Sequence, residues 1–139
     1  MDVFDRELIS NGNPMEVVVG FSRAVRVGPF ISIGGTAPVA PDGSTVGIGD
    51  VYAQTIRCIE IMKDALERSG SGLHDVVRTR VILTDIDNWK PAIEARKTYF
   101  RDVRPVDTIM AVSRFVNPDW LVELEADAVI SGWGAHSAA

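Results

Sequence analysis

The sequence contains a single cysteine, Cys58, and no long apolar run. One cysteine excludes an intrachain disulfide and a cysteine-based zinc site. No apolar stretch approaches the roughly 18 residues that indicate a membrane-spanning helix, so we expect no membrane partner. The first residues, MDVFDRELIS, carry acids where a secretory signal needs a basic start and an apolar centre. We therefore expect an intracellular, cytoplasmic protein in which Cys58 acts as a small buried hydrophobic residue.

The short motifs of common enzyme classes are also missing. There is no GxSxG, no GxxxxGK and no HExxH, and the two histidines, His74 and His136, stand apart from each other. The glycine-rich segment VGIGD follows no predicted strand and lacks a third glycine, which favours a turn over a nucleotide-binding loop. These absences disfavour nucleotide cofactors, catalytic histidines and catalytic metals.

Length and charge narrow the class of protein further. A chain of 139 residues is one ordinary domain, and we expect residues 1–12 and 132–139 to be peripheral to it. The formal net charge of −5 opposes nonspecific attraction to a phosphate backbone, so we expect no nucleic-acid partner.

The spacing of apolar residues predicts strands and helices in a definite order. The segment 21–35 alternates and turns at Gly28 and Pro29, which indicates a hairpin. Helical spacing predicts a helix over 50–69, with Asp50 as its N-cap and Gly70 beyond its end.

The second half of the chain repeats this mixture of strands and helices. A strand is predicted over 76–85 and two more close the chain, within 107–113 and 121–130. Between them, a helix over 88–100 tolerates Pro91 in its first turn and is expected to bury Trp89, Ile93 and Phe100. This order predicts an α+β fold in which two helices pack on one face of a single sheet. The other face needs cover, which predicts self-association.

The last predicted strand concentrates acidic side chains on one face. Glu123, Glu125 and Asp127 are two residues apart and point to one side, while the apolar residues between them point to the other. The acids form either a solvated face balanced by cross-strand arginines such as Arg78 and Arg80, or the wall of a site. Metal ligation by these acids is the less favoured alternative.

Several segments together resemble one family. They are GFSRAVRVG, FISIGGTAPVAPDG, DVVRTRVILTDIDNW, RPVDT and LVELEADAV, in this order from about Gly20 to Ile130. The set resembles the Rid family, also called the YjgF family. The resemblance implies a mixed sheet with two helices on one face, like that of bacterial chorismate mutase. It also implies a homotrimer with a central barrel and three intersubunit clefts for a small molecule.

The resemblance also implies an activity and a set of site residues. Members of the best-known branch hydrolyse reactive enamines and imines without a cofactor. There, an arginine in a Pro-Ala-Arg-Ser/Thr motif holds the substrate carboxylate, and a glutamate of the last strand activates water. Glu123 matches that glutamate, but the motif here reads Pro105, Val106, Asp107, Thr108. Phe21 stands where a tyrosine is common, and Gly34 where a serine is common.

We therefore predict Glu123 as the catalytic residue and a substrate-contacting set around it. That set comprises Phe21, Gly34, Gly35, Asp107, Thr108, Ile109 and Arg114. A carboxylate at 107 repels a substrate carboxylate, so deamination of 2-imino acids by the usual route is not expected. Either Arg104 or Arg114 is a candidate substitute cation. On this view, Asp107→Arg restores the missing guanidinium that holds the substrate carboxylate.

Two classes of function remain open from the sequence. One is a hydrolase of a neutral or cationic imine or enamine, in which Asp107 and Glu123 share a cleft and one carboxyl pKa is raised. The other is a trimer that binds a small metabolite without turning it over. RNA cleavage is disfavoured by the net charge and by the lack of basic patches interleaved with aromatic residues.

Overall fold

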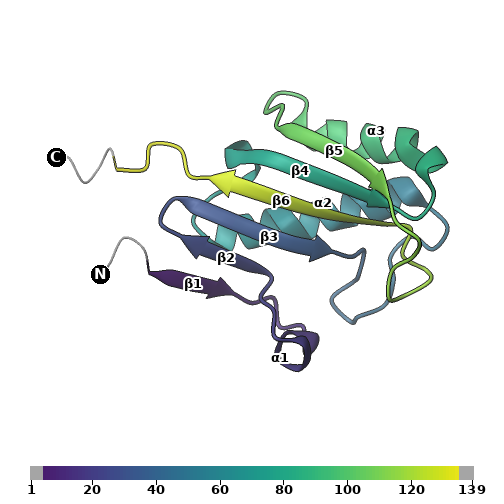
Figure 1. Cartoon of the computed structure of the whole chain (residues 1–139), viewed down its shortest axis with the longest axis horizontal. Helices are drawn as coiled ribbons and strands as arrows, with labels where there is room; N and C mark the ends of the chain where they lie inside the picture. Colours follow the sequence, from purple (N-terminus) through teal and green to yellow (C-terminus); the bar gives the residue numbers. More distant parts are fainter. Residues whose placement is uncertain (1–4, 135–139) are drawn as a thin grey trace.

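A computed structural model describes residues 5–134 as one six-stranded sheet with two long helices behind it (Figure 1). The strand order is β1-β2-β3-β6-β4-β5, and β4 and β5 are parallel while the other neighbours are antiparallel. The strands are β1 (Arg6–Ile9), β2 (Ala24–Val27), β3 (Phe30–Thr36), β4 (Val76–Leu83), β5 (Val106–Ala111) and β6 (Val122–Val129). The helices are α1 (Met15–Val19), α2 (Val51–Arg68) and α3 (Trp89–Phe100), with single 3-10 turns η1 (Leu73–Asp75) and η2 (Ile86–Asn88). The predicted α+β class and mixed sheet are confirmed.

Local sequence signals place the longer elements. β2 and β3 form the predicted hairpin around Gly28, whose φ of 57° is a left-handed turn conformation. The Asp50 side chain accepts a hydrogen bond from the Ala53 N–H and so caps α2, and Gly70 follows its end with a φ of 86°.

The short elements near the N-terminus were not predicted. The edge strand β1 lies within the segment expected to be peripheral and pairs with β2. Helix α1 has only five residues, none of them buried, so no apolar periodicity announces it in the sequence. His136 lies outside the described residues.

The core lies between the sheet and helices α2 and α3. The alternate residues Val122, Leu124, Ala126 and Ala128 of β6 are buried, as the sequence predicted, and Cys58 of α2 is fully buried against them. Cys58 is 0% exposed, which confirms it as a core residue, and this burial raises the pKa of its thiol.

The predicted buried face of α3 is partly wrong. The helix buries Phe100 together with the small residues Ala92 and Ala95, whereas Trp89 stays 44% exposed and Ile93 is half-buried. The helical spacing of the large apolar residues had predicted that Trp89 and Ile93 would lie on the buried face of α3. Close packing of α3 on α2 favours alanines at the contact, because small side chains let the helices approach.

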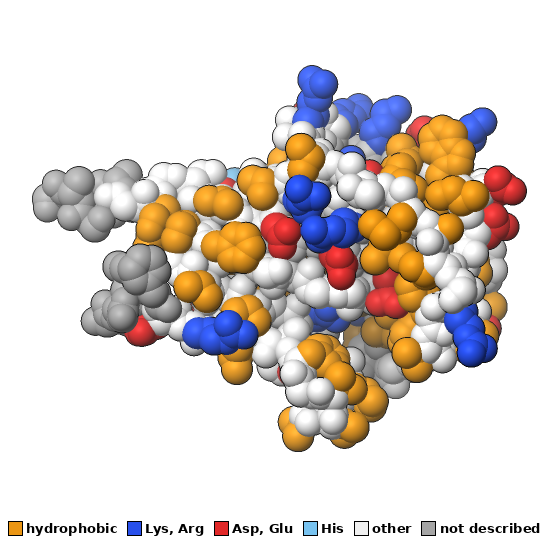
Figure 2. All heavy atoms as spheres, viewed as in Figure 1, with side chains coloured by type: hydrophobic (Ala, Val, Ile, Leu, Met, Phe, Trp, Pro, Cys, Tyr) orange, Lys and Arg blue, Asp and Glu red, His pale blue; other side chains and the backbone are white. Residues whose placement is uncertain are grey.

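The face of the sheet opposite the helices is open within one chain (Figure 2). It carries a cross-strand ion pair, Arg80 to Glu125 at 3.4 Å, and a hydrogen bond from Ser32 Oγ to Asp127 at 2.9 Å. Two of the three acids of β6 thus have partners within the sheet. This agrees with the alternative that the acids form a face balanced by cross-strand partners. Apolar side chains flank them and remain 42–61% exposed: Leu8, Phe30, Val106 and Val129.

No helix in the described range 5–134 is long and apolar enough to cross a membrane.

A buried aspartate ties the end of β6 to the turn before β4. Asp75 is 4% exposed and accepts hydrogen bonds from Ser71 Oγ at 2.6 Å and from Ser131 N and Oγ at 3.1 and 2.6 Å. Burial alone would raise the pKa of Asp75, but the hydrogen bonds from Ser131 and Ser71 outweigh it, so the pKa lies below its ordinary value.

Asp75→Asn should lower the free energy of unfolding at pH 7 by about 1–3 kcal/mol, because an amide nitrogen replaces an acceptor oxygen in a buried network. Urea denaturation measures this loss. The difference should shrink as the pH falls through the lowered pKa, where the wild-type carboxyl also becomes protonated. Asp42→Asn is the matched control, since Asp42 accepts similar bonds from Ser44 at the surface and should change stability little. Equal stability of Asp75→Asn and wild type at pH 7 would contradict the prediction.

Candidate functional site

A hollow of about 970 Å³ lies beside the adjoining ends of β3 and β6. Its walls come from the segment before α1, the loop after β3, the outer side of α2 and the loop before β6. It opens next to the lobe formed by α1, at the bottom of Figure 2. Aromatic and apolar side chains, including Phe21, Val116 and Trp120, share its lining with charged groups.

Glu123 forms part of this lining and is the unpaired member of the acidic strand. Its cross-strand neighbour on β4 is Ile82, so no arginine lies directly opposite. Within residues 5–134 its carboxylate has no hydrogen-bond or ion-pair partner within bonding distance. Burial raises the pKa of Glu123; the Arg23 cation opposes this effect and Glu125 adds to it.

Gly35 makes room for that carboxylate. A Cβ at position 35 would lie 3.0 Å from Glu123 Oε1, which is closer than side-chain atoms normally approach. The register between β3 and β6 shifts between Ile33 and Thr36, so the two glycines of β3 form an irregular stretch beside Glu123. The sequence predicted Gly34 and Gly35 near Glu123, and the structure brings Gly35 against it.

Arg23 is the residue that the sequence analysis missed. It precedes β2, is 6% exposed, and its Nη2 donates to the carbonyls of Gly34 at 2.8 Å and Gly35 at 2.7 Å. Its Nε is buried without a hydrogen-bond partner in the described part of the chain. Burial lowers the pKa of the guanidinium, while Glu123 opposes that shift. The sequence signal that could have identified Arg23 is a charged residue at the start of a predicted strand, next to an apolar residue.

Asp107 lies elsewhere, on the face covered by the helices. It pairs in register with the buried Thr79, whose Oγ1 donates to Asp107 Oδ1 at 2.7 Å. Arg96 of α3 also approaches, with its Nε 3.5 Å from the same oxygen. Within one chain Asp107 and Glu123 are therefore on opposite faces of the sheet. The predicted shared cleft lies between subunits and stays a prediction; within one chain, the register of β5 on β4 turns Asp107 towards the helices.

The remaining predicted contacts are dispersed. Thr108 pairs with Arg80 on the open face, and Ile109 packs against the core. Arg114 is exposed in the loop before β6, and Arg104 has a positive φ of 55° just after α3. Neither arginine is among the residues that line the hollow. Phe21, Gly35 and Glu123 are the predicted residues that the hollow brings together.

The structure offers no metal centre in the range 5–134. No group of three or more histidine, cysteine, aspartate or glutamate side chains gathers there in a way that could hold a metal ion. Glu125 and Asp127, the other acids of the proposed metal alternative, are occupied by Arg80 and Ser32.

Comparison with known proteins gives a consistent result. The sequence profile described as Endoribonuclease L-PSP matches residues 12–130. A RutC family protein from Pyrococcus abyssi is 34% identical over 123 residues, which cover 88% of this chain and 96% of that protein. A crystal structure of a member of the YjgF/YER057c/UK114 family from Mycobacterium tuberculosis is 37% identical. It aligns with a TM-score of 0.82 over 91% of this chain and all of that one.

Proposed function

The chain belongs to the Endoribonuclease L-PSP family, also called YjgF or Rid, and from this premise we propose that it hydrolyses a reactive imine or enamine, with Glu123 as the catalytic residue. The observation that carries the proposal is the state of Glu123. It is a partly buried carboxylate with a raised pKa and no protein partner among residues 5–134, and it lines a hollow large enough for a small metabolite.

A carboxylate in this state suits proton transfer near neutral pH. Burial brings its pKa closer to the working pH, where a group can both accept and return a proton. Its closest charged neighbours on β6 and β4 are already paired with each other, so Glu123 is available to a bound molecule.

The chemistry requires only water and one proton-transferring group. Glu123 takes a proton from water as the water oxygen attacks the carbon of the protonated imine, which gives a neutral carbinolamine. Glu123 then gives this proton to the amine nitrogen, the C–N bond breaks and ammonia leaves, and Glu123 takes the hydroxyl proton as the C=O bond forms. An enamine enters the same route after its carbon is protonated to give the imine.

The usual arginine at the motif position is absent, and Asp107 does not replace its function. Asp107 is engaged by Thr79 and Arg96 on the helix side, so its charge does not set the preference of the Glu123 hollow within one chain. Within one chain, the Asp107 charge therefore gives no reason to exclude a carboxylate-bearing substrate.

A direct assay tests the proposed activity. 2-Aminoacrylate is generated in situ from serine by a dehydratase, and its disappearance and the release of ammonia are followed with and without the protein. Acceleration over the uncatalysed reaction is expected. Binding of small metabolites without any acceleration, on this and on uncharged imines, would instead support the non-catalytic binding trimer.

We further propose that the protein is a homotrimer whose open sheet faces meet. The exposed apolar residues of that face support this, since monomers rarely leave such a surface uncovered. Phe30→Glu places a carboxylate on this face and should dissociate the trimer, because a buried unpaired charge is costly.

Sedimentation equilibrium at micromolar concentration checks the assembly. The wild type should show three times the chain mass of 15.1 kDa, and Phe30→Glu a lower mass. Tyr52→Glu is the matched control, because Tyr52 is similarly exposed but lies on the outer side of α2. A monomeric wild type, or a Phe30→Glu protein that remains trimeric, would contradict this proposal.

A further inference from the structure

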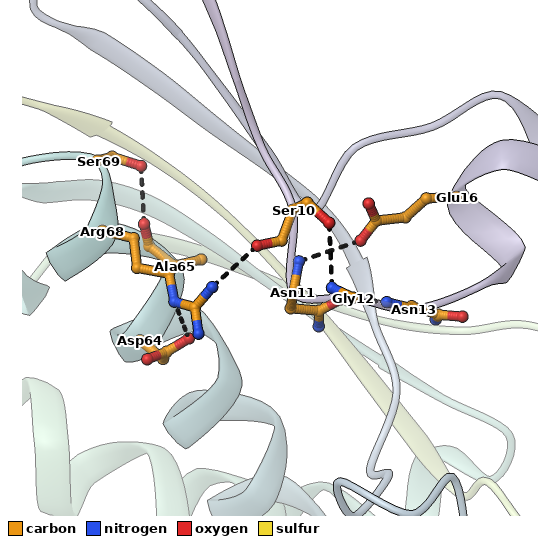
Figure 3. A network of polar contacts seen from close by, with 9 residues as sticks. All are labelled: Ser10, Asn11, Gly12, Asn13, Glu16, Asp64, Ala65, Arg68 and Ser69. Atoms are coloured by element: carbon orange, nitrogen blue, oxygen red, sulfur yellow. Dashed lines mark hydrogen bonds and ion pairs between the residues drawn. The ribbon is translucent and has the colours of Figure 1, made fainter.

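The arginines that line the hollow each hold backbone carbonyls of one of its walls. Arg68 donates to the Ser10 carbonyl at 3.0 Å and pairs with Asp64 at 2.9 Å, and so holds the segment before α1 against α2 (Figure 3). Arg57 donates to the Val39 carbonyl at 2.6 Å and so holds the loop after β3. The third arginine, Arg23, holds the wall that borders Glu123.

Arg23 is fixed by the backbone of β3. Its side chain is buried, and its Nη2 donates to the carbonyls of Gly34 at 2.8 Å and Gly35 at 2.7 Å. The register between β3 and β6 shifts at these glycines, so the regular strand ladder is interrupted and their carbonyls need other donors. A single guanidinium nitrogen that serves both carbonyls holds the irregular stretch in place.

Glu123 lies against the same glycine stretch. A Cβ at position 35 would lie 3.0 Å from Glu123 Oε1, so the carboxylate occupies space that any other residue would fill. Arg23 therefore holds the carbonyl of the residue that borders the carboxylate. Each of the two charges shifts the pKa of the other, yet no ion pair joins them within the described part of the chain.

Among residues 5–134, three other titratable groups act on this pair of charges: Glu125 of β6, Glu16 of α1 and the Cys58 thiol of α2. Glu125 raises the pKa of the Glu123 carboxyl, and burial keeps the Cys58 thiol neutral. Strand β4 places the apolar Ile82 opposite the carboxylate. Arg23 is therefore the cation that favours the ionised form of Glu123.

We propose that Arg23 is a positioning residue for Glu123: it fixes the glycine stretch that borders the carboxylate and supplies a positive charge beside it without pairing with it. The anchorage to the backbone matters, because a direct ion pair would occupy the carboxylate that must accept a proton from water. A cation anchored elsewhere favours the ionised carboxylate and leaves it free. This inference rests on the proposed function and adds to it a residue that acts through Glu123.

The ionisation of Glu123 tests this role without any turnover. The full-length protein is labelled with ¹³C at glutamate Cδ, and the resonance that is missing from Glu123→Gln is titrated by NMR. Arg23→Gln removes the charge and should raise the pKa of Glu123 by roughly one pH unit, since a nearby opposite charge lowers a carboxyl pKa. Arg23→Lys keeps the charge, so its Glu123 pKa should lie closer to that of wild type.

Arg68→Gln is the matched control. It removes a cation of the same hollow that is already paired with Asp64, and should leave the pKa of Glu123 unchanged. Circular dichroism of each variant checks the fold.

A second measurement needs no folded Arg23→Gln protein. The ¹⁵Nε resonance of Arg23 in wild type, identified by its absence from Arg23→Lys, should shift with the same midpoint as the Glu123 carbon. This shift should be absent from Glu123→Gln, because the titrating charge is gone.

Three results would overturn the role of Arg23. They are an unchanged Glu123 pKa in Arg23→Gln, equal rises in Arg23→Gln and Arg23→Lys, and an Arg23 resonance that does not respond to the ionisation of Glu123. The first two show that the charge at position 23 does not act on the carboxylate, and the third shows the same in wild type.

Failure of this role can be told from failure of the proposed function. If Glu123→Gln loses hydrolysis while Arg23→Gln keeps both the Glu123 pKa and the acidic limb of the pH profile, the hydrolase stands and the role of Arg23 is wrong. If wild type is inactive but the Glu123 pKa rises in Arg23→Gln alone, Arg23 positions Glu123 and the hydrolase is wrong.

Discussion

Glu123→Gln should lower kcat for imine hydrolysis roughly 10²- to 10⁴-fold, the range by which a positioned acid-base group contributes to catalysis. Glutamine has nearly the same size and fits the space that Gly35 leaves, but it neither accepts nor returns a proton in this reaction. Steady-state kinetics on 2-aminoacrylate generated in situ measures the loss. KM should change less than kcat, because the amide keeps the shape of the hollow.

Glu125→Gln is the matched control for this variant. Glu125 is two residues away on the same face of β6, but it pairs with Arg80 and does not line the hollow. Its activity should stay within about threefold of wild type, the small change expected on losing a partly exposed ion pair. Equal losses in the two variants, or full activity of Glu123→Gln, would remove Glu123 from the catalytic role.

The pH dependence of the wild type gives an independent test of the same residue. A general base must be ionised to act, so activity should rise with pH through the pKa of Glu123. Burial raises that pKa above its ordinary value of 4.5, and the acidic limb of the pH profile should therefore lie above pH 4.5. The limb should be absent from the residual activity of Glu123→Gln.

The same raised pKa predicts a change in stability. Because the folded state disfavours the charged form, ionised Glu123 costs stability at every pH above its folded pKa, and this cost vanishes below the unfolded value of 4.5. Glu123→Gln should therefore be more stable than wild type at pH 7 and equal to it in the acid range. Urea denaturation at both pH values checks this. A Glu123→Gln variant that is less stable than wild type at pH 7 would show that the attraction between Glu123 and Arg23 outweighs the cost of burying the Glu123 charge.

Asp107→Arg should destabilise the fold by roughly 1–3 kcal/mol, because it removes the acceptor of the Thr79 hydroxyl and leaves Arg96 without its partner. The Asp107 and Arg96 side chains are only 19% and 14% exposed, and Arg96 also donates to Thr79 and Pro105. A second guanidinium at 107 would repel Arg96. This is the opposite of the gain of activity that the sequence alone suggested for the substitution.

A charge exchange separates this repulsion from simple loss of packing. Asp107→Arg combined with Arg96→Asp restores opposite charges and should recover part of the lost stability, which a double-mutant cycle measures. Asp107→Asn should fall between wild type and Asp107→Arg, because it removes the charge but keeps an acceptor for Thr79. A stable, active Asp107→Arg protein would mean that position 107 serves the ligand after all.

The sequence by itself determined the fold class and, through its resemblance to the Rid family, the choice of Glu123 as the candidate catalytic residue. Alternation along 122–129 fixed which side of β6 faces the core, because successive strand residues point to opposite faces and the apolar set must be buried. That placed Glu123 on the open face. The Asp50 cap and Gly70 likewise fixed α2 within one residue at each end, since both signals act through local backbone geometry.

Only the tertiary structure decided which charges meet. β5 is a short edge strand that follows Pro105 and has no strong alternation, so its pairing with β4, not its own sequence, turns Asp107 towards Arg96. Arg23 is anchored to β3 because the irregular glycine stretch brings the Gly34 and Gly35 carbonyls within reach of its guanidinium. Both outcomes depend on contacts between segments far apart in the chain, which periodicity within one segment does not encode.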